Sequence, residues 1–168
     1  GLGDVYKRQG IVGIFEMPNT NPLTTTPEAL EHKIKRGTET AYTDFAYYFG
    51  GTYENSKNLP QWENLDGVCG IKIFMGASTG NLLSATDEEV EAVVANGRRV
   101  IAVHAEDEFL MNENKKTILK DSNDVGMHCK LRDVNSSLNA TKRVVTIAKK
   151  HNRHCLLYTS DAADDDVR

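Results

Sequence analysis

Three polar residues lie in or just after short apolar runs, and their side chains can do chemistry. They are Asn19 in Met-Pro-Asn-Thr-Asn-Pro, Lys72 in Gly-Ile-Lys-Ile-Phe-Met and His104 in Val-Ile-Ala-Val-His-Ala-Glu-Asp. Apolar runs of this length, bounded by turn residues and alternating with helical patterns, predict strands of a parallel sheet. Functional side chains gather at the carboxyl ends of such strands. The sequence therefore predicts a site built around these three residues.

Lys72 has two interpretations. Side chains alternate along a strand, so Lys72 and Phe74 share one face while Ile71 and Ile73 share the other. Burying an unpaired lysine is costly, so position alone favours an edge strand whose lysine reaches water. The chemical interpretation is a lysine of depressed pKa whose neutral amine forms a Schiff base or takes up carbon dioxide. The resulting carbamate can bridge two metal ions about 3.5–4 Å apart.

His104 and Asn19 are ambiguous in the same way. A lone histidine at a strand end is more often structural, but its position one strand after a buried lysine shifts the interpretation toward a zinc ligand. Glu106 and Asp107 can serve as hydrogen-bonding partners of such a ligand, although Asp107 more simply caps the next helix. Asn19 fits a turn, and it also fits an amide that hydrogen-bonds a carboxylate or amide of a substrate. Spacing does not choose between these.

The elements that position these residues alternate along the chain. Strands are predicted at 10–17, 44–50, 70–76 and 99–104, and helices at 26–40, 59–65, 86–97, from 106 and at 134–151. This order predicts an α/β fold, a partial (β/α) barrel of about four to five βα units. A complete barrel takes about 250 residues, so the chain is about half of one. A small doubly-wound domain is the competing architecture, but the chain has no glycine-rich nucleotide motif.

The two ends of the chain match each other through the genetic code. One DNA string encodes Asp4–Gln9, and its reverse complement encodes Cys155–Ser160. A protein has no reason to carry inverted repeats of its own gene at its termini, and both ends resemble translated sequencing adapters. We therefore expect residues 1–9 and 155–168 to be adapter-encoded, and residues 10–154 to be the natural barrel segment.

Composition excludes several classes of partner. The formal net charge is −4, of which residues 1–9 contribute +1 and residues 155–168 contribute −3, so −2 remains for the segment between them. Such mild acidity gives no reason to expect nucleic acid or anionic membrane as a partner. Cys69 and Cys129 form no CxxC pair, and no apolar run approaches a membrane span. We expect a reduced, cytoplasmic protein.

Taken in order, three motifs resemble dihydroorotase of the amidohydrolase superfamily. They are Met17–Pro22, Gly70–Asn81 and Val103–Asp107, and together they extend over nearly all of residues 10–154. Met-Pro-Asn-Thr is shared with hydantoinase, dihydropyrimidinase and allantoinase. The Ser-Thr-Gly-Asn loop that follows the lysine strand favours dihydroorotase.

The resemblance implies roles for the three residues. It makes Asn19 a substrate-binding residue near the substrate carboxylate, Lys72 a carboxylated lysine that bridges two zinc ions, and His104 a ligand of one of them. The implied reaction is the reversible cyclisation of N-carbamoyl-L-aspartate to L-dihydroorotate in pyrimidine biosynthesis. The metal ions would be the cofactors, and the small molecule would be the main partner. The resemblance also implies a homo-oligomer or an association with a carbamoyltransferase.

The resemblance also names residues that this sequence does not hold. The family begins its site with a His-x-His pair and an arginine before residue 10, has a further histidine ligand past His104, and places its catalytic aspartate far beyond residue 154. We therefore expect no catalytic residue in this chain, no turnover by the chain alone, and poor solubility from open sheet edges. The alternatives are a hydantoinase, dihydropyrimidinase or allantoinase, and a non-catalytic dihydroorotase-like scaffold subunit.

Overall fold

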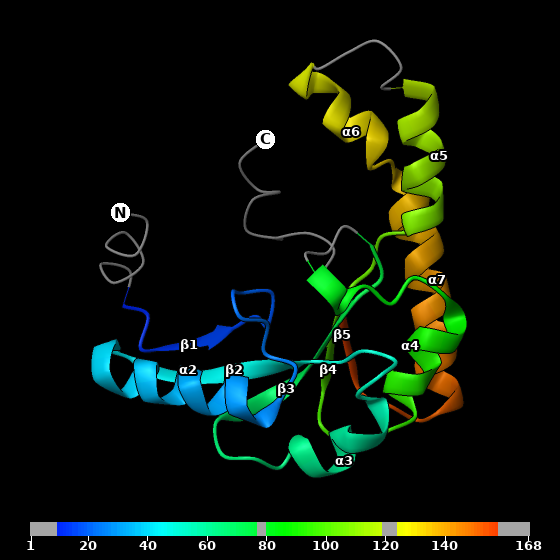
Figure 1. Ribbon diagram of the computed structural model, residues 1–168. Helices are drawn as coiled ribbons and strands as arrows, with labels where there is room; N and C mark the ends of the chain where they lie inside the picture. Colours follow the sequence, from blue (N-terminus) through cyan, green and yellow to red (C-terminus); the bar gives the residue numbers. More distant parts are fainter. Residues whose placement is uncertain (1–9, 77–79, 119–123, 158–168) are drawn as a thin grey trace.

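A parallel sheet of five strands forms the centre of the computed structural model, which describes residues 10–76, 80–118 and 124–157. The strands pair in chain order, and every neighbouring pair is parallel. They are β1 (Gly13–Glu16), β2 (Asp44–Gly50), β3 (Val68–Phe74), β4 (Ile101–His104) and β5 (Cys155–Leu157). The sheet twists steadily from β1 to β5 (Figure 1). This confirms the predicted α/β partial barrel, because sequential parallel strands joined by helices are its repeating unit.

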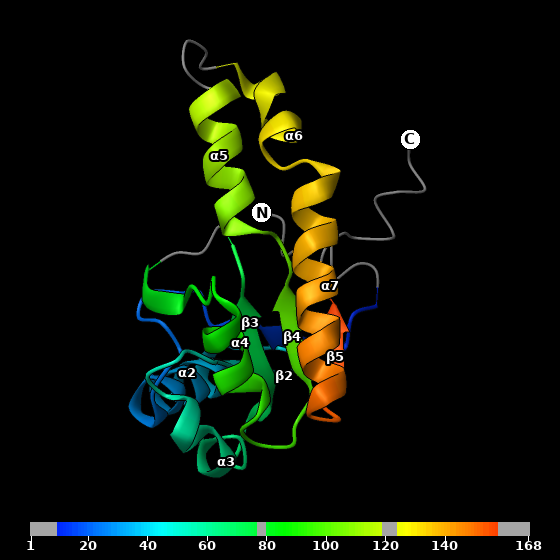
Figure 2. The same ribbon diagram turned by 90° about the vertical axis from the view of Figure 1, so that its right-hand side faces the viewer.

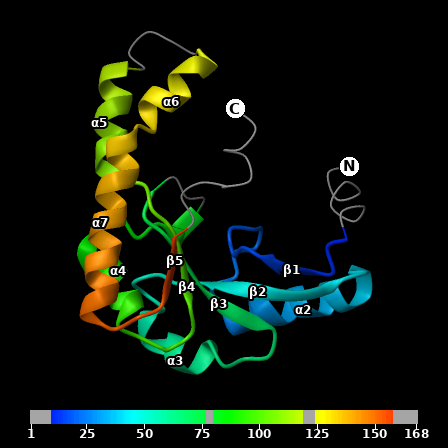
Figure 3. The ribbon, with the colours of Figure 1, turned by 180° about the vertical axis from the view of Figure 1, so that it is seen from behind.

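Helices cover one face of the sheet. They are α2 (Pro27–Thr40), α3 (Leu59–Trp62), α4 (Asp87–Val94), α5 (Glu108–Ile118), α6 (His128–Leu131) and α7 (Val134–Lys150), with short 3-10 turns η1 (Ser56–Asn58), η2 (Gly80–Leu82) and η3 (Val125–Met127). Helix α2 lies along β2, and α4 and α7 pack side by side (Figure 2). Helices α5 and α6 extend past the carboxyl end of β4 (Figure 3). Within the described residues, no helix is long and apolar enough to cross a membrane.

Capping residues begin the helices where the sequence predicts. Thr26 caps α2, with Pro27 as its first residue. Thr86 and Glu89 form a capping box at the predicted start of α4, each side chain accepting a hydrogen bond from the other's backbone N–H. Helix α4 ends at Val94 rather than at the predicted Gly97. Gly97 instead lies in the following turn with φ of 88°, where a Cβ would stand 2.4 Å from an oxygen of Glu63.

The apolar core lies between the sheet and its helices, on the face that the alternation predicts. Ile71 and Ile73 are both fully buried there. Helix α7 contributes Ala140, Val144 and Ile147. The helical periodicity of 134–151 predicts an apolar face that includes Leu138, but Leu138 is 47% exposed. It falls off the helical stripe that the buried residues share.

Among the residues that the structure describes, both edges of the sheet are open. All four residues of β1 are exposed, and Phe15 is 66% exposed. At the other edge, β5 is made of three of the residues expected to be adapter-encoded. Cys155 and Leu157 pack against the core, while Leu156 faces the opposite side and is 43% exposed. Strand β5 extends the sheet because its three residues pair in register with 101–103 of β4.

The amino ends of the strands are tied together by one buried carboxylate. Glu63 is 3% exposed and accepts hydrogen bonds from the backbone N–H groups of Arg98 at 2.6 Å and Arg99 at 3.0 Å. It also pairs with Arg153 Nη2 at 3.3 Å. The turns that lead into β4 and β5 therefore share one anchor, at the opposite end of the strands from the candidate site.

Candidate active site

Lys72 lies inside the sheet and not at its edge. Its strand β3 pairs with β2 and β4, and Lys72 stands in register between Gly50 and Ala102. The side chain is buried, at 3% exposure, with Nζ 4.8 Å from the centroid of the Phe74 ring. The interpretation as an edge-strand lysine that reaches water was wrong. Burial lowers the pKa of Lys72 to about 8, and the Cys155 thiol opposes this shift.

Small residues on the neighbouring strands leave the lysine room on its face. Its two register partners carry a hydrogen atom and a methyl group as side chains. A Cβ atom added at Gly50 would stand 2.6 Å from Leu82 Cδ2, which is too close for a side chain there. The chain therefore keeps the surroundings of Lys72 compact and mostly apolar, and this is what disfavours its charged form.

His104 ends the neighbouring strand on the same face as Lys72. It stands in register with Phe74, and the two ring centroids are 6.3 Å apart. Its Nε2 lies 2.6 Å from Glu106 Oε2, and the same oxygen pairs with Arg132 Nη1. The hydrogen bond from His104 is the main cause that lowers the pKa of Glu106, burial opposes it, and the charges of His104, Arg132 and His128 add to it. The predicted contact of Glu106 with His104 is confirmed.

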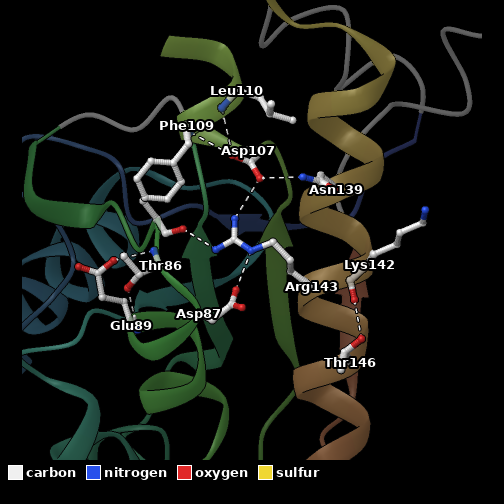
Figure 4. A network of polar contacts seen from close by, with 11 residues as sticks. Thr86, Asp87, Glu89, Asp107, Phe109, Leu110, Asn139, Lys142, Arg143 and Thr146 are labelled. Carbon is white, nitrogen blue, oxygen red and sulfur yellow. Dashed lines mark hydrogen bonds and ion pairs between the residues drawn. The ribbon is translucent and has the colours of Figure 1, made fainter. Parts of the chain in front are cut away.

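Asp107 caps the next helix, as the simpler interpretation predicted. Its Oδ1 accepts hydrogen bonds from the backbone N–H groups of Phe109 at 3.0 Å and Leu110 at 3.2 Å. Its Oδ2 is held by Arg143 Nη1 from α7 at 3.2 Å (Figure 4). Asp107 is 4% exposed. The segment that follows His104 is therefore fixed by a buried carboxylate, which contacts both the start of α5 and Arg143 of α7.

Arg143 joins three elements through its guanidinium group. Besides Asp107, it donates to Asp87 Oδ1 at 2.6 Å and to the carbonyl of Ala85 at 2.6 Å (Figure 4). Sequence reasoning found neither Arg143 nor Arg132, because their partners lie 36 and 26 residues away and no motif links them. A basic residue on the half-buried side of an amphipathic helix is the one signal that the sequence offered for Arg143.

Asn19 lies in the loop after β1, exposed and two strands away from β3. The loop itself is fixed to the end of β2. The backbone N–H of Thr24 donates to the carbonyl of Pro18 at 3.0 Å, and the N–H of Gly50 donates to the carbonyl of Thr24 at 2.8 Å. All three predicted residues thus lie toward the carboxyl ends of the strands, but only Lys72 and His104 are on adjacent strands.

The described part of the chain supplies an incomplete set of metal donors. Within it, no group of three or more His, Cys, Asp or Glu side chains is gathered to hold an ion. Lys72 and His104 are the two candidate donors on one face. His128 begins the short helix α6 and not the long last helix α7, which begins at Val134. Ser78 and Thr79, whose loop favoured dihydroorotase, lie outside the described residues.

Comparisons with known proteins find relatives in both sequence and structure. No protein-family model matches the chain. It is 36% identical over 115 residues to the L-hydantoinase of Paenarthrobacter aurescens, covering 65% of this chain and 24% of that protein. It is 32% identical over 125 residues to the dihydroorotase of Methanosarcina acetivorans, covering 73% of this chain and 26% of that protein. The structure of an L-hydantoinase from Arthrobacter aurescens matches 88% of this chain and 34% of its own, with a TM-score of 0.78 and 28% identity.

The chain spans about a quarter of the length of the curated relatives it matches. The structural likeness nevertheless covers 88% of this chain, and it supports the parallel half-barrel sheet described above. Relatives named dihydroorotase and hydantoinase match in sequence, and a structure named L-hydantoinase matches in fold. Together these likenesses support a place for the chain among the cyclic amidohydrolases of the amidohydrolase superfamily.

Proposed function

We propose that the full-length protein with this barrel segment is a zinc-dependent dihydroorotase, which reversibly cyclises N-carbamoyl-L-aspartate to L-dihydroorotate. The observation that carries the proposal is Lys72, buried in a central strand with its pKa lowered to about 8, one strand away from His104. A lysine in this setting has its neutral amine available near neutral pH. Structural lysines seldom occupy such a position, because their burial is costly.

The neutral amine of Lys72 is what carbon dioxide needs. A bond forms between Nζ and the carbon of carbon dioxide, one proton leaves to solvent, and a carboxylate on a long arm results. Carboxylate and imidazole are both ligands that zinc accepts. Carboxylated Lys72 and His104 therefore fit a zinc ion, although these two residues alone do not supply a full set of zinc ligands. When bound, zinc supplies polarisation of the amide carbonyl and activation of water.

Three side chains of this chain would then divide the work. Lys72 would hold metal through its carbamate, and His104 would hold it through its imidazole. Asn19, on the fixed loop after β1, would donate a hydrogen bond to the substrate carboxylate. We expect Asn19→Ala to raise KM for carbamoyl-aspartate and to change kcat less. The Asn19 side chain would bind the substrate carboxylate and would not touch the bond that reacts.

The test uses the full-length protein purified with zinc. Cyclisation of carbamoyl-aspartate and hydrolysis of dihydroorotate are measured beside hydantoin, dihydrouracil and allantoin. Wild type is expected to turn over dihydroorotate fastest, and Lys72→Ala and His104→Ala are expected to fall to background. Lys115→Ala is the matched control, because Lys115 is an exposed lysine on α5. Full activity of the Lys72→Ala enzyme would refute the proposal.

A hydantoinase is the second candidate, because an L-hydantoinase is among the matches in both sequence and structure. Its site would carry the same Lys72 and His104 and act on a ring without a carboxylate. Fastest turnover of a hydantoin in the same assay would favour it. A folded, zinc-loaded protein that is inactive on every ring would instead favour the scaffold subunit.

A further inference from the structure

We infer that Arg143 is a positioning residue for the segment 80–86, and that it fixes this segment between the loop of Asn19 and the strand of Lys72. The inference rests on the proposed function in one respect, since it assigns this part of the barrel to substrate binding. Arg143 touches no substrate in this account and acts through the segment that it holds. The hold itself is a property of this chain and can be measured without metal or substrate.

The first step is the place of the segment beside the lysine strand. After β3 ends, the chain returns to it: Leu83 forms a parallel bridge with Phe74, and the N–H of Ser84 donates to the carbonyl of Phe74 at 2.8 Å. Phe74 is two residues after Lys72 in the same strand and shares its face. The segment is therefore bonded to the strand end that carries the candidate lysine.

The second step is Leu82, which brings the segment onto the Lys72 face of the sheet. Gly50 stands in register with Lys72, so a Cβ added at Gly50 would point to the same face. That Cβ would be 2.6 Å from Leu82 Cδ2 and 3.3 Å from Pro18 Cβ. Leu82 is fully buried, and Pro18 directly precedes Asn19. Leu82 therefore fills the space between the Asn19 loop and the Lys72 face.

The third step is the hold of Arg143 on the far end of the segment, through three separate donors (Figure 4). Nη2 donates to the carbonyl of Ala85 at 2.6 Å, and Nε donates to Asp87 Oδ1 at 2.6 Å. Nη1 donates to Asp107 Oδ2 at 3.2 Å, and Asp107 lies just past β4. One planar guanidinium therefore locks the chain that follows β3 to the chain that follows β4.

Arg153 offers a matched comparison at the opposite end of the strands. It also pairs with a buried carboxylate, that of Glu63, at 3.3 Å. The next residue, His154, accepts a hydrogen bond from the N–H of Ile101 at 3.0 Å. Loss of either arginine removes a buried ion pair, but only Arg143 acts at the end of the strands where the candidate site lies.

The first experiment is amide hydrogen exchange in the 168-residue chain without metal, followed by NMR and corrected for the global stability of each variant. Arg143→Met should speed exchange of the Ser84 N–H by about 10–100-fold and leave the Ile101 N–H near wild type. Arg153→Met should do the reverse. Arg143→Lys keeps the charge, but one ammonium group cannot hold three partners around a plane, so it should speed exchange at Ser84 as well.

The second experiment is steady-state kinetics of the full-length, zinc-loaded protein on dihydroorotate. Arg143→Met should raise KM by about 10-fold and change kcat less, because the segment that it frees borders the substrate-binding loop. Arg153→Met should leave KM unchanged, although it also removes a buried pair. Asn19→Ala should raise KM less in the Arg143→Met background than in wild type, since the two changes weaken the same contact with substrate.

Two results would overturn the inference. One is unchanged exchange of the Ser84 N–H in both Arg143→Met and Arg143→Lys, and the other is an equal rise in KM in Arg143→Met and Arg153→Met. Arg143→Lys keeps the test open if Arg143→Met does not fold, as its circular dichroism will show.

The two proposals fail in different ways. Faster exchange at Ser84 in the Arg143 variants, together with a full-length protein that hydrolyses no cyclic amide, would sink the proposed function and leave the hold on segment 80–86 intact. Turnover of dihydroorotate with a KM that ignores Arg143 would do the reverse.

Discussion

Lys72→Met tests the burial of the lysine, on which the proposed function depends. Methionine keeps most of the length of lysine and removes the charge, and the site is buried at 3% exposure. The wild-type chain must discard the proton of Lys72 or bury a charge when it folds at neutral pH. The methionine variant has neither cost, so it should be the more stable protein at pH 7.

The size of the effect follows from the two pKa values. The pKa of Lys72 falls from its ordinary value of 10.5 to about 8 in the folded chain. Each pKa difference of one is worth about 1.4 kcal/mol, so the full cost to wild type is about 3 kcal/mol. The unfolded chain binds more protons between these pKa values, so wild-type stability rises with pH there. The cost is complete below pH 8 and disappears above about 10.5.

The assay is urea unfolding of both proteins at a series of pH values, in buffer freed of carbon dioxide so that the amine stays unmodified. Packing differences between lysine and methionine do not depend on pH, so the change in the gap is the sharper quantity. The gap is expected to shrink from about 3 kcal/mol at pH 7 toward its packing remainder above pH 10. Lys115→Met is the control, and it should stay within about 0.5 kcal/mol of wild type throughout. A gap that does not change with pH would refute the reasoning.

Three further outcomes are expected. Arg143→Met should lower the free energy of unfolding by about 2 kcal/mol in urea, because it strips partners from buried Asp107 and from Asp87, whereas Lys142→Met on the exposed side should change it little. Equal urea unfolding midpoints for Arg143→Met and Lys142→Met would contradict a stabilising role of the Arg143 contacts. Phe15→Lys should reduce self-association in sedimentation velocity, since Phe15 is 66% exposed on the open β1 edge; unchanged association would point to another surface. The purified 168-residue chain with zinc should cyclise no carbamoyl-aspartate, because Lys72 and His104 alone cannot define a two-metal centre; measurable turnover would refute this.

Much of the fold was predictable because its signals are local. Strand β2 falls at the predicted residues, 44–50, since a buried parallel strand shows as a continuous apolar run. The starts of α2 and α4 were predictable from Thr26 and from Thr86 with Glu89, because a capping side chain acts within three residues of itself. Elements whose cause lies within their own sequence are the ones that sequence alone locates.

The contacts that position the site were not predictable, because their causes are distant in sequence. Arg132 and Arg143 reach Glu106 and Asp107 only in the folded chain, across 26 and 36 residues of sequence. The burial of Lys72 was likewise invisible, since a lysine among isoleucines fits an edge strand as well as a central one. It took the pairing of β3 on both sides to exclude the edge.

The buried charges of this chain are sorted by position along the strands. The pair of Glu63 with Arg153 joins the turns at the amino ends, where it holds strands together. Glu106 with Arg132 lies at the carboxyl end of β4, beside the candidate metal ligand His104. A buried ion pair contributes little to stability compared with apolar packing, so stability alone does not account for the second pair. Its place at the carboxyl end of β4 accounts for it better, because the Glu106 oxygen that Arg132 holds is the one that lies 2.6 Å from His104 Nε2.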